Sequence, residues 1–347
     1  MDRMTRRIAF LLCVLGLLPL QAGAQPFAAT GARAAGMGGA FTAMADDASA
    51  VYWNPAGLAA GAIVSVVLDL GQAAASPSEL GSGHDRSSFL LALTTPAVGL
   101  GYYRLRSTIA APGIQLLPGA GSGQASGVPV AGEFGVESLV THHAGVTLVQ
   151  SITQGVAIGS TLKFVRGIAA SQSVLTLDPE AALDAGSDLI GRATNRFDLD
   201  AGVMVYGGPF KAGLTVRNIL EPEFPTAGEG SRELVLERQT RAGLAYMVSS
   251  AWVAAADFDL LKTTDVYGER RDAAFGAEGQ LLRQVWVRSG VRFNTAGDDD
   301  RIDDARAAAY SVGGSFAPRA GLLIDGHFTT GSGRAGREWG VAARFVY

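Results

Sequence analysis

The residues with the clearest chemical potential are an acidic pair, Asp46 and Asp47, in a stretch that is otherwise small and apolar. A carboxylate buried in such a stretch needs a cation beside it, because removing one member of a buried pair costs about 3–5 kcal/mol. One interpretation is an electrostatic latch, in which a distant lysine or arginine holds at least one of the two acids. The alternative is that they cap a short helix beginning near Ala48, since Asp is a good N-cap residue.

Other polar groups do not assemble into a catalytic or metal-binding pattern. His142 and His143 are neighbours on a predicted strand, so they face opposite sides and cannot both bind one metal ion. The acidic run at 298–304 lacks the ligand spacing and the glycine of an EF-hand loop, which favours a solvated loop over weak Ca²⁺ binding. No nucleophile, base and orienting group come together. We therefore predict no enzymatic activity, no cofactor and no metal centre.

The N-terminus has the composition of a targeting segment. A basic start, an apolar run at 8–20 and an Ala-Gly-Ala site before Gln25 are typical of a cleaved signal peptide over 1–24. The apolar run is too short for a membrane-spanning helix, which needs about 20 residues, and an uncleaved anchor is the alternative. The single cysteine, Cys13, lies in this segment, so the mature chain is predicted to contain no disulfide.

The composition indicates a membrane protein without a spanning helix. The sequence is 48% hydrophobic, with a mean hydropathy of +0.22, yet no stretch after the targeting segment approaches about 18 uninterrupted apolar residues. Apolar residues spread over alternating positions are typical of a transmembrane β-barrel, which faces lipid outside and keeps a polar interior. The 28 basic and 32 acidic residues form no concentrated basic patch, which argues against a nucleic-acid partner.

Segments with the period of a strand recur along the rest of the chain. The predicted strands are 61–71, 87–95, 97–108, 135–150, 155–169, 194–206, 210–220, 234–247, 250–261, 271–281, 285–295, 308–317, 320–330 and 337–347. Tight turns alternate with longer loops such as 109–134, 170–193 and 296–307. Outer-membrane barrels alternate in this way, with short periplasmic turns and long extracellular loops. We predict an all-β membrane protein, an antiparallel transmembrane β-barrel of about 14 strands, with a soluble all-β protein as the alternative.

The period of two assigns a face to each side chain in these strands. If the apolar face meets lipid, the charged side chains line the lumen. The predicted lumenal charges are Lys163, Arg196, Asp198, Asp200, Lys211, Arg217, Arg241, Asp257, Asp259, Glu278, Arg288, Arg292, Asp325, Glu338 and Arg344. Because both signs are present, the pattern favours a lumen braced by ion pairs over a pore selective for one charge.

The last predicted strand ends in an aromatic residue, Tyr347, and alternates along its length. This pattern resembles the C-terminal strand signal that the barrel-assembly machinery reads. Aromatic residues near other strand ends, such as Tyr246 and Trp252, fit an interfacial girdle. The predicted partners therefore include the barrel-assembly machinery and outer-membrane lipids, and the predicted location is the outer membrane of a Gram-negative envelope.

The run RAAGMGGAFTAMADDASAVYWNPAGLA at 33–59 carries a family resemblance. It resembles the N-terminal signature of the FadL-like outer-membrane barrel superfamily, and most of all its PorV and TraF-like branch. A second stretch, VRNILEPEF at 216–224, is similar to a strand-to-loop element of the same branch. Together they cover about a tenth of the chain.

The resemblance implies that residues 25–60 form a plug or hatch inside a barrel made by 61–347. The Asn-Pro turn that closes the stretch lacks an N–H at the proline and would direct the chain into the first strand. The residues implicated in plugging and gating are Arg33, Asp46, Asp47, Trp53, Asn54 and Pro55.

The predicted loop 109–134 is unusually apolar, and exposed apolar patches often mark binding surfaces. Its candidate residues for capturing a hydrophobic molecule are Ile114, Leu116, Leu117, Val128 and Phe134. The alternative is that the loop folds inward and caps the mouth of the barrel.

Three functions follow from the resemblance. The first is uptake of hydrophobic small molecules across the outer membrane, with capture at the external loops, a pocket in the lumen and release when the plug shifts. The second is a PorV-like or TraF-like component of a secretion or conjugation apparatus, which would bind protein partners. The third, an open diffusion porin, conflicts with a plug and paired charges that would obstruct flow.

Overall fold

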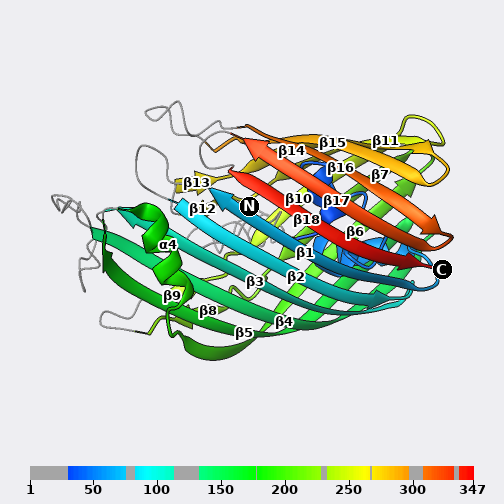
Figure 1. Cartoon of the computed structure of the whole chain (residues 1–347). Helices are drawn as coiled ribbons and strands as arrows, with labels where there is room; N and C mark the ends of the chain where they lie inside the picture. Colours follow the sequence, from blue (N-terminus) through cyan, green and yellow to red (C-terminus); the bar gives the residue numbers. More distant parts are fainter. Residues whose placement is uncertain are drawn as a thin grey trace, which may run out of the picture.

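The computed structural model describes residues 30–75, 83–112, 133–176, 178–227, 233–265, 268–296, 308–331 and 336–347, and the predicted signal peptide lies outside these ranges. In them the chain forms a closed antiparallel barrel of fourteen strands, and each strand pairs with its neighbours along the chain until β1 closes on β18 (Figure 1). The barrel strands are β1 (Ser65–Ala75), β2 (Gly83–Thr94), β3 (Val98–Pro112), β4 (Glu133–Thr153), β5 (Val156–Leu175), β6 (Arg192–Gly207), β7 (Phe210–Arg217), β10 (Gln239–Met247), β11 (Trp252–Asp259), β14 (Asp272–Leu282), β15 (Val285–Asn294), β16 (Ala308–Arg319), β17 (Leu322–Gly331) and β18 (Arg337–Val346).

Every predicted barrel strand is present, so the predicted fold class is confirmed. The smaller elements are α2 (Ala32–Gly36), α3 (Ala50–Trp53), the 3₁₀ helix η1 (Pro55–Ala60), α4 (Pro179–Ser187), and the hairpins β8 (Glu223–Pro225) with β9 (Glu233–Val235) and β12 (Thr263–Asp265) with β13 (Gly268–Arg270). None of these helices, in the part of the chain that the structure describes, is long and apolar enough to cross a membrane.

Two of the predicted loops were wrong in extent. The predicted loop 109–134 begins and ends inside strands, because β3 continues to Pro112 and β4 starts at Glu133. The predicted loop 170–193 contains the end of β5 and all of α4. The predicted strand 210–220, in contrast, is too long. β7 ends at Arg217, because Asn218 has a left-handed φ of 53° that interrupts a strand.

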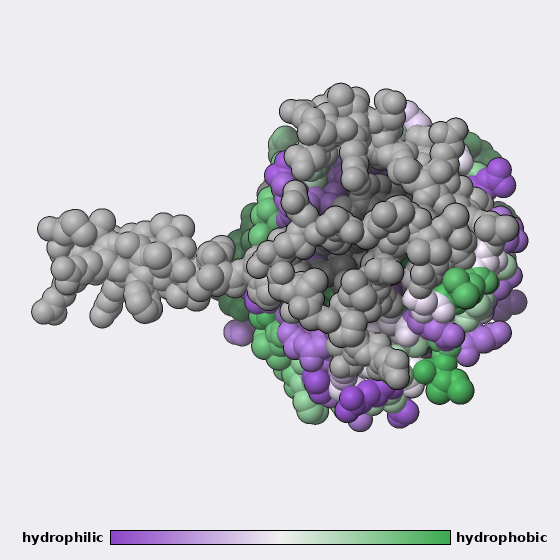
Figure 2. All heavy atoms as spheres, turned by 90° about the vertical axis from the view of Figure 1, so that its left-hand side faces the viewer, coloured by the Kyte–Doolittle hydropathy of each residue, from purple (hydrophilic) through white to green (hydrophobic). Residues whose placement is uncertain are grey.

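The connections define two ends of the barrel. One end, here the short-turn end, carries the tight connections at 95–97, 154–155, 208–209, 248–251, 283–284 and 320–321. The other, the long-loop end, carries the longer connections, and β4 and β5 project toward it with 21 and 20 residues. Figure 2 looks onto the long-loop end, where hydrophilic and hydrophobic residues lie side by side around the rim.

The two faces of the wall follow the predicted alternation. On β5 the outward Leu162 is 58% exposed, whereas its neighbour Lys163 faces the lumen and is fully buried. On β6 the outward Phe197 is 64% exposed and the inward Asp198 is fully buried. The strands therefore present a continuous apolar outer surface, as a lipid-facing wall requires.

Helix α4 packs on the outside of the barrel at the long-loop end (Figure 1). Asp178 accepts a hydrogen bond from the Glu180 N–H (2.9 Å), and a proline occupies the first helical position, so the helix has a well-formed N-cap. Its Ala182 is buried against Phe134 and Val136 of β4. The helix thus covers outward side chains where the strand projects.

The N-terminal segment 30–60 lies inside the barrel, in the half nearer the short turns. Helix α2 contacts β1 and β15–β18, and η1 contacts β4, β5 and β6 on the opposite wall. Phe41, Tyr52 and Trp53 form its fully buried core, with ring centroids 5.7 Å apart for Phe41–Trp53 and 5.9 Å for Tyr52–Trp53. This packing buries apolar surface inside a tube whose own lining is largely polar.

Inward glycines create the room for this segment. A Cβ on Gly202 of β6 would collide with the Asn54 side chain, and one on Gly290 of β15 would collide with the backbone at Met37. Any larger residue at these positions would push the segment off the wall. The inner surface is therefore shaped to the backbone of residues 30–60 on two opposite sides.

A second element enters the lumen from the long-loop end. Phe224 of β8 is fully buried against the inward side chains Leu139 and Val165. Leu234 of β9 and Leu236, which follows β9, belong to the same buried cluster. The connection between β7 and β10 therefore folds into the lumen. Inward folding was the alternative considered for a different loop, 109–134. Residues 113–132 of that loop lie outside the described ranges.

Candidate functional site

The start of α2 is held by the barrel wall. Asp69 of β1 accepts hydrogen bonds from the backbone N–H groups of Gly31 (3.1 Å) and Ala32 (2.6 Å). This carboxylate satisfies donors that a helix N-terminus leaves free. Sequence reasoning missed Asp69, although an acid among the apolar residues of a strand was a visible signal.

Arg33 connects the segment to itself and to the wall. Its Nη1 donates to Asp46 Oδ1 (2.6 Å) and Asp47 Oδ2 (3.0 Å), and its Nε and Nη2 donate to Glu278 of β14 (2.9 and 2.8 Å). Burial disfavours its charge, but Asp46 and Glu278 raise the pKa of Arg33 well above its ordinary value. The planar guanidinium thus binds three carboxylates at once.

Asp47 contacts both an arginine of the wall and the turn before α3, but it does not cap that helix as the alternative interpretation required, because α3 begins at Ala50 with Ser49 as its N-cap residue and has no side-chain cap hydrogen bond. Its Oδ1 accepts from the Ser49 N–H (2.9 Å) just before α3, and its Oδ2 accepts from Arg344 of β18 (3.1 Å). Burial alone would raise the pKa of Asp47, but the guanidiniums of Arg344 and Arg33 and the Ser49 hydrogen bond outweigh it and lower the pKa to about 2. Latch and turn-stabilising contacts coexist on separate oxygens.

These contacts close into a ring of alternating charges that we call the ionic ring. Arg288 of β15 contacts Glu278 (2.5 Å) and Asp325 of β17 (3.2 Å), and Asp325 contacts Arg344 (2.5 Å). The ring therefore runs Arg33, Glu278, Arg288, Asp325, Arg344, Asp47 and back to Arg33. Two members belong to the N-terminal segment and four to the wall.

A second group of wall residues holds the backbone of the segment between α2 and α3. Asp257 of β11 accepts from the N–H groups of Phe41 (3.1 Å) and Thr42 (2.8 Å). Arg241 of β10 donates to the Gly39 carbonyl (3.3 Å) and pairs with Asp259 (2.6 Å). These hydrogen bonds are made to backbone groups of the segment. They therefore position its backbone and do not depend on which side chains it carries.

The Asn-Pro turn forms a third attachment. Asn54 donates through Nδ2 to the carbonyls of Thr42 (3.1 Å) and Val203 of β6 (3.2 Å). Its Oδ1 accepts from the Ala56 N–H (3.2 Å) at the start of η1. Trp53 donates through its indole to the Thr30 carbonyl (3.1 Å). The turn therefore ties the exit of the segment to the wall before the chain enters β1.

Other predicted lumenal charges serve a different element. Lys163 binds Asp198 (2.8 Å) and Asp200 (2.7 Å), and Asp200 accepts from the Asn218 N–H (2.9 Å). Arg217 instead contacts the N-terminal segment, because its guanidinium lies 3.6 Å from the ring centroid of Tyr52. The Lys163 cluster therefore anchors the start of the connection that carries β8 and β9.

The predicted lumenal cations divide into those that contact the acidic pair and those that do not. Arg344 binds Asp47 directly, and Lys211 lies 3.7 Å from Asp46. Arg292 instead lies 3.8 Å from Asp272 and 3.7 Å from Glu338. Arg288 reaches the acids only through the ring. The pairing between Arg33 and the acids is local to the segment and was not anticipated.

The predicted capture residues are only partly within the described ranges. Ile114, Leu116, Leu117 and Val128 lie outside them. Phe134 belongs to β4 and is buried beneath α4, so its assignment to an exposed loop was wrong. His142 and His143 face opposite sides as predicted, with His143 stacked on Tyr103 in the lumen at 4.2 Å. In the described residues no group of His, Cys, Asp and Glu could hold a metal ion.

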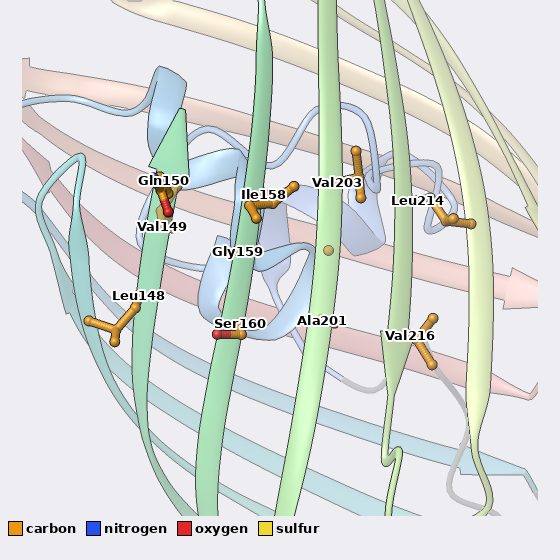
Figure 3. Close-up of a pocket in the computed structure, with 11 residues that line it drawn as sticks. Leu148, Val149, Gln150, Ile158, Gly159, Ser160, Ala201, Val203, Leu214 and Val216 are labelled. Atoms are coloured by element: carbon orange, nitrogen blue, oxygen red, sulfur yellow. The ribbon is translucent and has the colours of Figure 1, made fainter. Parts of the chain in front are cut away.

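An apolar pocket of about 630 Å³ lies in the outer wall near the short-turn end (Figure 3). Its floor is made of the small residues Gly159, Ser160, Ala201 and Gly202, where η1 and the Asn54 turn press on the wall from inside. The remaining lining residues are Leu148, Val149, Gln150, Ile158, Val203, Leu214 and Val216.

Comparison with solved structures identifies the type of barrel fold. The barrel superimposes on a Pseudomonas aeruginosa FadL homologue with a TM-score of 0.62 and 11% identity, covering 94% of this chain and 100% of that one. The fold is that of the FadL-type channels. The "CymD monoaromatic hydrocarbon channel" gives 0.62 at 10% identity (93% and 99% covered), and the "Pseudomonas putida toluene transporter TodX" gives 0.56 at 13% (94% and 98%).

Sequence comparisons are less extensive. A family model described as "F plasmid transfer operon, TraF, protein" matches residues 132–259, which is less than half of the chain. No curated protein sequence matches. Sequence identities of 10–13% to these structures establish the FadL-type fold alone. The ligand must be inferred from the site itself.

Proposed function

We propose that this protein is an outer-membrane channel for uptake of hydrophobic small molecules, in which residues 30–60 act as a movable plug. The single observation that carries the proposal is that the lumen of a FadL-type barrel is filled by its own N-terminal segment through side-chain and hydrogen-bond contacts. Such contacts can be exchanged when a solute enters. The structures of similar fold that are described as hydrocarbon channels and a toluene transporter support this substrate class.

The distribution of contacts supports a plug that moves as a unit. The ionic ring joins α2 and the acidic pair to four wall strands, β14, β15, β17 and β18, and the Asn54 turn joins the exit to β6 across the lumen. Between them Asp257 holds only backbone groups. A passage for solutes therefore opens when one of these attachments is released while the other still tethers the segment.

The wall pocket supports an apolar solute. Its volume lies in the range of small-molecule sites, about 300–1,000 Å³. It opens toward the apolar outer surface, and Gly159 and Gly202 place no side chain between it and the plug. A hydrophobic molecule bound there would exchange with the bilayer more readily than with water.

A disulfide lock tests the moving plug. Val51 of the segment and Gly101 of β3 are suitably placed, since a Cβ on Gly101 would lie 3.5 Å from the Val51 Cβ, within the roughly 3.5–4.5 Å that a disulfide needs. The only natural cysteine is Cys13, in the predicted signal peptide, so the pair Val51→Cys and Gly101→Cys would be the only thiols of the mature chain. We expect the oxidised double variant to take up N-phenyl-1-naphthylamine no faster than cells without the protein.

Reduction of the same variant should restore uptake, and each single cysteine variant controls for the substitution itself. Equal uptake in the oxidised and reduced forms would refute the moving plug. Uptake that never exceeds that of cells without the protein, in wild type or variant, would refute the channel.

The family-model match over 132–259 favours a second candidate, a barrel that serves a conjugation apparatus by binding protein partners. Its matched range includes α4, which presents a helix on the outer surface. If this candidate is right, deletion of the protein lowers plasmid transfer between cells and leaves uptake of the hydrophobic probe unchanged.

A further inference from the structure

A row of cationic residues crosses the outer face of three neighbouring strands. Arg104 of β3 lies opposite His142 of β4, and His142 lies opposite Arg166 of β5. All three share the outward face with the exposed apolar residues of their strands, and Arg106 is the next outward residue of β3. Neighbouring strands are about 4.8 Å apart, so the row spans about 10 Å.

The row marks the edge of the apolar surface. Toward the short-turn end the next outward side chains are Tyr102 and Phe164, which are 37% and 42% exposed, followed by leucine and valine residues. From Ile158 to Arg166 the chain advances about 27 Å along β5, or about 20 Å along the membrane normal at a tilt of about 40°. That height is close to the roughly 25 Å apolar band of such barrels.

Toward the long-loop end the outward surface changes character. Thr108 and Ser138 follow the cationic row, and their hydroxyl groups lie 3.4 Å apart. Helix α4 covers the strands beyond them. The row therefore lies between the apolar band and a rim that α4 covers, where a lipid headgroup would be.

These cations lack protein partners, unlike those of the lumen. Within the described ranges, Arg104, Arg106 and Arg166 make no ion pair and no hydrogen bond, and the Nε of Arg106 is buried without a partner. His142 contacts only the hydroxyl of Tyr102, at 2.8 Å from Nδ1. Asp85 of β2 also faces outward near the row, opposite Thr108, and forms no ion pair with it. A cluster of like charges is repulsive without an anion to share.

We propose that Arg104, His142 and Arg166 form a binding site for the phosphate groups of a phosphorylated glycolipid in the outer leaflet of the outer membrane. The guanidinium groups of Arg104 and Arg166 supply paired N–H donors that match phosphate oxygens, and Arg106 extends the site toward the rim. The acyl chains lie along Tyr102 and Phe164. Two guanidinium groups about 10 Å apart, with His142 between them, suit a headgroup that carries more than one phosphate. The site is on the outer surface, so it does not depend on the proposed channel.

The test measures binding of lipid A, a diglucosamine lipid with two phosphates, to the purified full-length barrel by native mass spectrometry in detergent. We expect Arg104→Gln with Arg166→Gln to weaken binding about 10- to 100-fold. The matched control, Arg283→Gln with Arg319→Gln, removes the same charge at exposed positions of the short-turn end and should bind within twofold of wild type. Retention of heat-modifiable mobility on gels establishes that each variant is folded.

Further arms identify the ligand class. Dephosphorylated lipid A should bind wild type as weakly as the double variant binds lipid A, and phosphatidylglycerol should bind wild type at least tenfold more weakly than lipid A does. Unchanged binding of lipid A by the double variant would overturn the site. Equal affinity of wild type for phosphatidylglycerol and lipid A would overturn the assignment to a glycolipid. Should the double variant fail to fold, Arg166→Gln alone, the exposed end of the row, is expected to lose about three- to tenfold.

Discussion

Replacing Asp47 by Asn tests whether the ionic ring holds the plug. The amide keeps an oxygen that accepts from the Ser49 N–H, so the turn before α3 retains its hydrogen bond. What is lost is the negative charge between Arg33 and Arg344, whose contacts are 3.0 and 3.1 Å. The substitution therefore separates the electrostatic latch from the turn-stabilising role.

The size of the effect follows from the environment of Asp47. A decrease in pKa from 3.8 to about 2 corresponds to about 2 kcal/mol of favourable interaction with the charged form. The Asp47 side chain is only 4% exposed, so solvent screens little of this. Arg33 keeps Asp46 and Glu278 as partners and Arg344 keeps Asp325, so the loss stays below the roughly 3–5 kcal/mol that is typical when a buried charge loses its only partner. We expect the docked plug to lose about 2 kcal/mol relative to a released one.

Limited proteolysis of the folded barrel measures this loss, because cleavage of a transiently opened segment tracks its open population when closing is fast. A change of 2 kcal/mol raises cleavage within residues 30–60 about 30-fold. Asp46→Asn is the matched control: the Asp46 side chain is 31% exposed, so its loss should cost about 0–1 kcal/mol. Equal cleavage of the two variants, or no change in Asp47→Asn, would refute the ring as the latch.

The same carboxylate gives the latch a pH dependence of known sign. Because the pKa of Asp47 is lower in the docked state than in the released one, its contribution is complete above about pH 4 and is lost as pH falls through about 2. The difference in plug cleavage between wild type and Asp47→Asn should therefore be constant from pH 7 to 4 and shrink below that. Asp47→Asn should show a smaller rise over the same acidic range. A plug released between pH 7 and 5 would contradict the assignment.

Other predictions concern the wall and the assembly of the barrel. Leu162→Arg, in the middle of the apolar face, should lower the free energy of unfolding from a lipid bilayer by about 2–4 kcal/mol. Leu175→Arg, at a side chain that is 81% exposed at the long-loop end of β5, should lower it by only about 0–1 kcal/mol. Urea unfolding of the two variants measures the difference. Gly202→Val should displace Asn54 and raise proteolysis near the Asn-Pro turn, while leaving heat-modifiable mobility intact. Deleting residues 345–347 should reduce recovery in the outer-membrane fraction, and normal insertion of this truncation would refute the terminal signal.

The number of strands, their order and the face of each side chain could be predicted from the sequence. These features are local: a period of two separates Leu162 from Lys163 whatever the rest of the chain does, and the length of a connection is read directly. Helix α4 was missed because its N-cap signature, Asp178 followed by Pro179, was overlooked in a segment taken for a loop.

The partners of the charged residues were decided only by the tertiary structure. Arg33 and Glu278 are 245 residues apart, and Asp47 and Arg344 are 297 apart. Their meeting depends on closure of β1 on β18 and on the height at which the segment docks, which no local pattern encodes. The inward glycines such as Gly202 and Gly290, like Asp69, were overlooked sequence signals of that docking. Parity predicts which way a residue faces, and only the closed barrel determines what it meets there.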